Sequence, residues 1–136
     1  MLQVVDLHTY YGDSHVLQGV NLQVEEGTIA AVLGRNGMGK TTLCRSLTGL
    51  TPARAGRIVF NGRDITRLPP HRICREGIGL VPQGRRIFSS LTVSEHLAIA
   101  GGKRGRVPTP FSTWDVEQVF TLFPRLESAG IIEATS

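Results

Sequence analysis

The chain has 136 residues, 40% of them hydrophobic and 19% charged, and its formal net charge is +4. This length suffices for one hydrophobic core but is short for two domains, and no apolar run is long enough to span a bilayer. Two cysteines argue against a disulfide-stapled secreted domain, and the few aromatic residues lie outside the basic clusters, which argues against a nucleic-acid partner.

A predicted strand leads directly into a glycine-rich loop. Residues 28–33 form a short, mostly apolar run rich in β-branched and small side chains, which predicts one buried strand. Residues 41–50 then place apolar side chains at spacings that suit one face of a helix, at Leu43, Cys44, Leu47 and Leu50. The loop between them consists of Gly34, Arg35, Asn36, Gly37, Met38, Gly39, Lys40, Thr41 and Thr42. It fits the phosphate-binding pattern of Gly, four residues, Gly-Lys-Ser/Thr, in the strand-to-helix context that this pattern requires.

The residue types in this loop suit the binding of a nucleoside triphosphate. Gly34, Gly37 and Gly39 can adopt positive φ, which lets main-chain N–H groups approach phosphate oxygens without obstruction. The start of the helix adds unpaired N–H groups and the positive end of its dipole. Lys40 would reach the β and γ phosphates, at about 1.5–3 kcal/mol for each charge-assisted hydrogen bond. Thr41 would place its hydroxyl on Mg²⁺.

Two further strand-like segments follow the loop. Residues 55–65 read as a strand, an Asn61-Gly62 turn and a short return, which predicts a β-hairpin. Residues 77–83 are a short apolar run that ends on Gln83 and predicts another strand. A glutamine after a proline is usually a solvated loop residue, so the position of Gln83 after the loop is what gives it significance.

The last third of the chain contains one linker candidate and one helix candidate. Residues 101–110 begin with two glycines and contain two prolines, which is typical of a linker. Residues 114–123 place four apolar side chains among polar ones, which predicts an amphipathic helix packed in a core. We interpret the basic clusters at residues 85–86 and 103–106 as solvated surface.

The loop, with Asn36 before Gly37 and a second threonine at Thr42, resembles that of the ATP-binding subunits of ABC transporters. Residues 11–27 also resemble the opening segment of these subunits. The resemblance implies an α/β fold of the P-loop NTPase class: an incomplete ABC ATPase core with an antiparallel β subdomain and the start of a helical subdomain. It implies a single incomplete domain, with the core and β subdomain in residues 1–83 and the helical subdomain beginning in residues 84–136.

The same resemblance implies ATP contacts outside the loop. In the family an aromatic ring near the amino terminus stacks on adenine, and Tyr11 is the matching position, with Tyr10 as the alternative if the register shifts by one. An ordinary half-buried strand aromatic is the competing interpretation of Tyr11. A glutamine that leaves a strand contacts Mg²⁺ and the attacking water in the family, and Gln83 matches it. ATP and Mg²⁺ are therefore the expected cofactors, with Thr41 and Gln83 at the metal.

The residues around Gln83 narrow the resemblance to one branch of the family. Residues 68–73, 83–88 and 91–97 resemble the ATPases of bacterial importers for branched-chain amino acids or urea. This implies a membrane-embedded permease and a second ATP-binding subunit as partners, and a cytoplasmic location on the inner face of the plasma membrane. The apolar residues Phe88, Leu91 and Val93 would contact the permease or, alternatively, pack within the helical subdomain.

The sequence contains no candidate catalytic residue. No apolar run ending in Asp-Glu, no Leu-Ser-Gly-Gly-Gln-like signature and no later switch histidine occurs, so we read the chain as the amino-terminal part of an ABC ATPase. Three hypotheses remain: an importer ATPase subunit, another phosphoryl-transfer enzyme, or a nucleotide-binding or interaction fragment without hydrolysis. Against another phosphoryl-transfer enzyme, the sequence lacks the base-reading motif of GTPases. A fragment without hydrolysis suits the isolated chain best. An unpaired apolar strand at residues 28–33 would also favour association with other chains.

Overall fold

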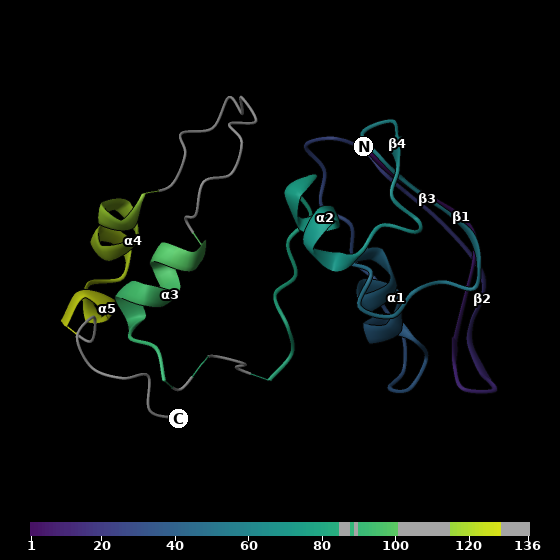
Figure 1. Ribbon diagram of the computed structural model, residues 1–136, viewed down its shortest axis with the longest axis horizontal. Helices are drawn as coiled ribbons and strands as arrows, with labels where there is room; N and C mark the ends of the chain where they lie inside the picture. The colour runs from purple at the N-terminus through teal and green to yellow at the C-terminus, as the bar shows by residue number, and fades with distance from the viewer. Residues whose placement is uncertain (85–87, 89, 101–114, 129–136) are drawn as a thin grey trace. The chain divides into compact units, whose positions relative to one another are not determined.

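The computed structural model describes residues 1–84, 88, 90–100 and 115–128. They fall into two compact units, residues 1–80 and residues 81–136. The first unit contains a β-sheet and two helices, and the described part of the second contains three short helices (Figure 1). No helix within the described ranges is long and apolar enough to cross a membrane.

The first unit is built on a four-stranded antiparallel sheet with the strand order β2-β1-β3-β4. Its strands are β1 (Leu2–Tyr11), β2 (Ser14–Val24), β3 (Ala55–Phe60) and β4 (Arg63–Asp64). Asn61 and Gly62 connect β3 to β4 with φ of 47° and 78°, and a type I′ turn needs positive values at both positions. The hairpin predicted for residues 55–65 is confirmed.

Strand β1 is irregular in its middle. Val4, Leu7 and Thr9 are buried, which breaks the alternation of a regular strand, and the pairing register shifts against both neighbouring strands in this stretch. Asp6 lies in the irregular stretch with φ of 47°. Gly56 of β3 approaches so closely that a Cβ there would lie 2.2 Å from the main-chain oxygen of Asp6. The sheet therefore needs a glycine at this point.

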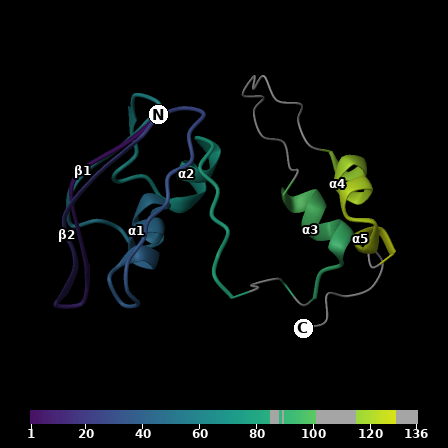
Figure 2. The same ribbon diagram turned by 180° about the vertical axis from the view of Figure 1, so that it is seen from behind.

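Helices α1 (Lys40–Leu47) and α2 (Pro70–Arg75) lie on the same side of the sheet in both views (Figures 1 and 2). Each contributes to one core, which contains the buried residues Val4, Leu7, Leu17, Leu43, Ala53, Ile58, Ile65 and Ile73. The helix predicted after the loop is confirmed. It ends at Leu47 because Gly49 follows with φ of 73°, a left-handed conformation that terminates helices.

Two predicted strands are wrong. Residues 28–33 and 77–83 form no strand, and Ile29 and Leu33 are 100% and 90% exposed instead of buried. An isolated strand leaves its main-chain groups without partners, so it forms only beside a hydrogen-bonded neighbour. Among the described residues, the one sheet contains only β1 to β4 and offers neither segment a neighbour.

The described part of the second unit contains helices α3 (Val93–Ala100), α4 (Val116–Leu122) and α5 (Pro124–Ser128). Asp115 and Gln118 form a reciprocal capping box at the start of α4. The predicted amphipathic helix is therefore confirmed over Val116–Leu122, but none of its residues is buried, contrary to the expected core packing. Trp114 and the linker candidate at residues 101–110 lie outside the described residues.

Candidate nucleotide-binding site

The glycine-rich loop connects the exposed segment 28–33 to α1. Residues 34–38 are exposed, whereas Gly39 is buried at the start of the helix. Gly37 and Gly39 have φ of 82° and 88°, the left-handed conformation for which glycine is suited. A Cβ on Gly39 would lie 2.9 Å from Cδ2 of Leu17 on β2. Packing against β2 and main-chain conformation therefore both require glycine at this position.

Lys40 folds back over the loop. Its ammonium group donates hydrogen bonds to the main-chain oxygens of Gly34, at 2.6 Å, and Arg35, at 2.7 Å. The positive charge is therefore held among the main-chain atoms of the loop that the sequence predicts to bind phosphate. A phosphate-binding lysine has to occupy this region.

The amino-terminal end of α1 has main-chain donors without helical partners. The first hydrogen bond of the helix runs from the N–H of Leu43 to the oxygen of Gly39, at 2.8 Å. The N–H groups of Lys40, Thr41 and Thr42 precede it and have no carbonyl acceptor within the helix. No side chain caps this end of α1. These donors, the helix dipole and the Lys40 ammonium can together bind an anion.

The two threonines of the loop differ in exposure. Thr41 is exposed, so its hydroxyl is accessible to a metal ion, as its predicted role requires. Thr42 is only 6% exposed, and it acts in the same direction as Thr51 in lowering the pKa of the Tyr11 hydroxyl. The structure therefore brings the loop and the amino-terminal tyrosine together, although they are far apart in the sequence.

Tyr11, at the end of β1, lies beside α1. The Tyr11 hydroxyl oxygen is 3.3 Å from Oγ1 of Thr51. The same Thr51 Oγ1 accepts a hydrogen bond from Nε of Arg45 at 3.1 Å. Hydrogen bonds with Thr51 and Thr42 lower the pKa of the Tyr11 hydroxyl, and the charge of Arg45 acts in the same direction. Tyr11 is 47% exposed, so part of its surface remains accessible to a ligand.

Tyr10, the alternative candidate, has different partners. Its ring stacks on that of His15, with centroids 4.1 Å apart, and the guanidinium carbon of Arg54 lies 4.5 Å from its centroid. Arg54 also donates a hydrogen bond to the main-chain oxygen of Gly12. The structure therefore links Tyr11, and not Tyr10, to the loop.

Gln83 and the predicted permease contacts belong to the second unit. The Gln83 side chain is exposed. Phe88 is 65% exposed, and its ring stacks on that of His96, with centroids 6.0 Å apart. Leu91 and Val93 are partly buried. The role of Gln83 and both interpretations of the three apolar residues stay predictions.

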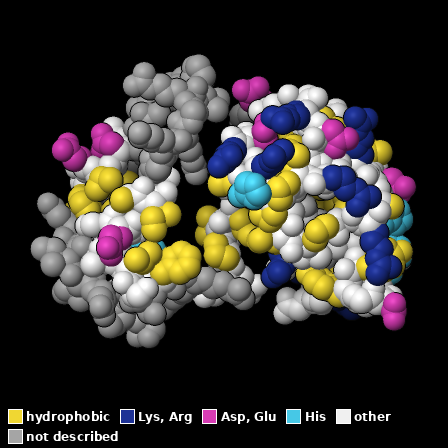
Figure 3. Space-filling view, in the orientation of Figure 1, with side chains coloured by type: hydrophobic (Ala, Val, Ile, Leu, Met, Phe, Trp, Pro, Cys, Tyr) yellow, Lys and Arg dark blue, Asp and Glu magenta, His cyan; other side chains and the backbone are white. Residues whose placement is uncertain are grey.

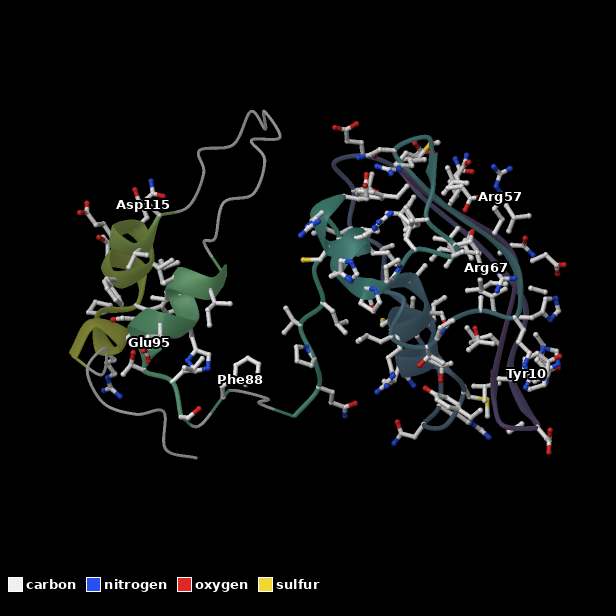
Figure 4. All side chains as sticks on the ribbon, in the orientation of Figure 1. Tyr10, Arg57, Arg67, Phe88, Glu95 and Asp115 are labelled. Atoms are coloured by element: carbon white, nitrogen blue, oxygen red, sulfur yellow. The ribbon has the colours of Figure 1, made fainter. Side chains whose placement is uncertain are left out.

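An open cavity of about 430 Å³ lies elsewhere in the first unit. It is lined by Gly56, Arg57, Asp64, Thr66, Arg67 and Leu68, and contains none of the predicted site residues. Figure 4 labels its two arginines, and Figure 3 shows Lys and Arg side chains spread over this unit among acidic ones. Arg57 pairs with Asp64 at 2.8 Å, and Arg67 donates to two main-chain oxygens. Both arginines therefore already have partners within the protein, and the cavity is not assigned to the nucleotide.

Sequence reasoning missed two groups of polar contacts. One joins Tyr11 to Thr51 and Arg45. The other joins His8 and His15, whose Nδ1 and Nε2 atoms are 2.9 Å apart, with Asp6 Oδ1 at 3.0 Å from His8 Nε2. Each includes a contact between different elements, Tyr11 with Thr51 and His8 with His15, which no local sequence signal could have identified. Within the described ranges, no group of three or more His, Cys, Asp or Glu side chains could hold a metal ion.

Comparison with known proteins identifies the family. The sequence profile described as ABC transporter matches residues 17–133. The chain is 39% identical over 127 residues to the high-affinity branched-chain amino acid transport ATP-binding protein BraG of Pseudomonas aeruginosa, covering 93% of this chain and 53% of that protein. It is 42% identical over 100 residues to the probable branched-chain amino acid transport ATP-binding protein LivF of Archaeoglobus fulgidus, covering 74% of this chain and 42% of that protein.

A solved structure supports the same assignment. The crystal structure of a nucleotide-free ATP-binding cassette from an ABC transporter matches 98% of this chain and 57% of its own, with a TM-score of 0.72 and 27% sequence identity. The chain thus spans about half the length of the relatives it matches. The predicted fold class is confirmed, and membership of the family implies ATP binding. From sequence and structure together, the chain belongs to the ABC transporter family, as an ATP-binding protein.

Proposed function

We propose that residues 34–42 bind the triphosphate of ATP and that the adenine ring stacks on Tyr11. The observation that carries this proposal is the arrangement at the start of α1. The Lys40 ammonium and the N–H groups ahead of Leu43 lie at this helix end, and Tyr11 lies beside the same helix, with its hydroxyl oxygen 3.3 Å from Oγ1 of Thr51. A base stacked on an aromatic ring gains about 1–3 kcal/mol, and the charged groups supply the phosphate contacts.

Lys40→Ala tests the phosphate loop directly. A ligand that binds only the folded state raises stability by RT ln(1 + [L]/Kd), so ATP with Mg²⁺ should raise the melting temperature of the wild-type chain. Loss of a charge-assisted hydrogen bond, about 1.5–3 kcal/mol, should weaken ATP binding by roughly 10- to 100-fold. Lys103→Ala, at the only other lysine of the sequence, is the matched control and should keep the full ATP-dependent shift. Equal shifts in Lys40→Ala and the wild type would contradict the assignment.

We also propose that the Thr41 hydroxyl and the Gln83 side-chain oxygen contact a Mg²⁺ ion bound with the nucleotide. Mg²⁺ prefers oxygen ligands, and both side chains are exposed. ATP affinity measured with and without Mg²⁺ tests this for each residue. Thr41→Val and Gln83→Leu should each reduce the gain in affinity that Mg²⁺ provides, and an unchanged gain in either variant would remove that residue from the proposal.

We infer that the protein is the ATP-binding component of a bacterial importer for branched-chain amino acids or urea, acting with a permease and a second ATP-binding subunit on the cytoplasmic face of the membrane. The similarity to BraG and LivF, both named as branched-chain amino acid transport proteins, supports the amino acid class. A second candidate function is nucleotide binding without hydrolysis. Phosphate release from ATP by the purified chain distinguishes the two, because steady turnover would reject the second function.

A further inference from the structure

A chain of hydrogen bonds connects helix α1 to the Tyr11 ring. The guanidinium of Arg45 can only donate, and its Nε donates to Oγ1 of Thr51 at 3.1 Å. Because Thr51 accepts there, its own hydroxyl proton is available for the Tyr11 oxygen, 3.3 Å away. The N–H of Thr51 returns a hydrogen bond to the main-chain oxygen of Arg45, at 3.1 Å. Thr51 is therefore held at both its main chain and its side chain.

The exposure of these residues shows which end of the tyrosine is anchored. Thr51, the hydrogen-bond partner of the Tyr11 hydroxyl, is only 8% exposed, whereas Tyr11 itself is 47% exposed. The hydroxyl is thus fixed against a buried group, while part of the residue remains accessible. A fixed hydroxyl limits rotation of the ring about its side-chain bonds, and a ring that is already oriented loses less entropy when a base stacks on it.

We propose that Thr51 and Arg45 are positioning residues for the nucleotide base: they orient the Tyr11 ring for stacking and tie it to the helix that carries Lys40. This inference rests on the proposed binding of ATP by Lys40 and Tyr11. It adds that hydrogen bonds through Arg45 and Thr51 connect the residue that contacts the base to the helix that contacts the phosphates. A change at Thr51 should therefore affect the base-dependent part of binding and leave the phosphate-dependent part intact.

A comparison of ATP with tripolyphosphate separates the two parts, because tripolyphosphate carries the phosphates without a base. Both ligands would be titrated with Mg²⁺ into the full chain by calorimetry. We expect the wild type to bind ATP more tightly than tripolyphosphate. Thr51→Val should weaken ATP binding by about three- to tenfold, the effect of one hydrogen bond, and leave tripolyphosphate binding unchanged. Thr51→Ser, which keeps the hydroxyl, should retain the wild-type ratio of affinities.

Variants of Tyr11 test whether the two residues act together. Tyr11→Phe keeps the ring but lacks the hydroxyl, so it should match Thr51→Val. The double variant should lose no more than either single one, because both remove the same contact. Tyr11→Ala should abolish the preference for ATP over tripolyphosphate. Additive losses in the double variant would overturn the proposed connection.

The matched control is Thr48→Val. Thr48 is also buried, at 9% exposed, but its hydroxyl donates to the main-chain oxygens of Cys44 and Arg45. The ratio of ATP affinity to tripolyphosphate affinity in Thr48→Val should equal that of the wild type. The positioning role is rejected if Thr51→Val weakens the binding of ATP and of tripolyphosphate equally or changes neither. Failure of the proposed function looks different: Lys40→Ala would bind tripolyphosphate normally, or the wild type would show no preference for ATP.

Discussion

At the scale of single residues, Asp64 shows how one carboxylate organises a turn. Its Oδ1 accepts hydrogen bonds from the N–H and the hydroxyl of Thr66, at 3.0 and 2.6 Å, and its Oδ2 accepts one from Arg57 at 2.8 Å. The hydrogen bonds from Thr66 are the main cause that lowers the pKa of Asp64 to about 2, and Arg57 acts in the same direction. The folded hairpin therefore stabilises the ionised form of the Asp64 carboxylate.

We expect the free energy of unfolding to decrease as the pH falls from about 4 to about 2. The pKa of Asp64 is lower in the folded chain than its ordinary value of 3.8, so its contribution is present above that value and is lost as the carboxylate is protonated towards about 2. The side chain is 45% exposed, so solvent screening keeps this contribution modest. Urea unfolding at several pH values should show a weaker pH dependence in Asp64→Asn than in the wild type, and an unchanged dependence would contradict this account.

At the scale of elements, the pairing of β1 with β3 depends on Gly56. Its φ is 92°, and the Cβ of an alanine would lie 2.2 Å from the main-chain oxygen of Asp6. Gly56→Ala should lower the free energy of unfolding by about 2–4 kcal/mol, because a strained φ costs roughly 1–3 kcal/mol and the overlap must also be relieved.

Gly62→Ala is the matched control for this prediction. Gly62 also has positive φ, of 78°, but a Cβ there would have no heavy atom within 4 Å. Its substitution should cost only the conformational penalty, about 1 kcal/mol. Urea unfolding of both variants measures the difference, and equal losses would show that the close approach of Gly56 to β1 does not matter.

The elements that could be predicted from the sequence are those whose hydrogen bonds are local. Helix α1 closes its own hydrogen bonds, and the Asn61-Gly62 turn has its conformational preference in the two residues themselves. The segments at 28–33 and 77–83 have the composition of strands but no neighbour in the described sheet.

The same distinction applies to the candidate site. The glycines and Lys40 lie within one short stretch, so the motif alone is enough to predict them as one site beside the start of α1. The partner of the Tyr11 hydroxyl, Thr51, is 40 residues away in the sequence. It is one of several threonines with no motif around it, so only the three-dimensional structure could identify it.

At the scale of the whole molecule, the exposed apolar segment at residues 28–33 predicts association. Ile29 and Leu33 are 100% and 90% exposed, and burying such a side chain between chains gains roughly 1.5–3 kcal/mol. We expect the wild-type chain to self-associate with increasing concentration in sedimentation velocity. The double variant Ile29→Thr and Leu33→Thr should associate less, at unchanged stability, because neither side chain belongs to the core.

Ile99→Thr provides the control for this effect. Ile99 is 64% exposed on α3, so its substitution also removes an apolar side chain from the surface. If Ile99→Thr reduced association as much as the double variant, general surface hydrophobicity would be responsible. A wild-type chain that remains monomeric at high concentration would reject the prediction altogether.

The two contacts of the Lys40 side chain have a consequence for how an anion would be received. An ammonium group has three N–H bonds, and two of them point to the oxygens of Gly34 and Arg35. We expect the third to remain available for a phosphate oxygen while the other two stay in place. Fixing a free lysine side chain costs about 1.5–2 kcal/mol of entropy. Here the fold has already immobilised it, so more of the electrostatic attraction would appear as affinity.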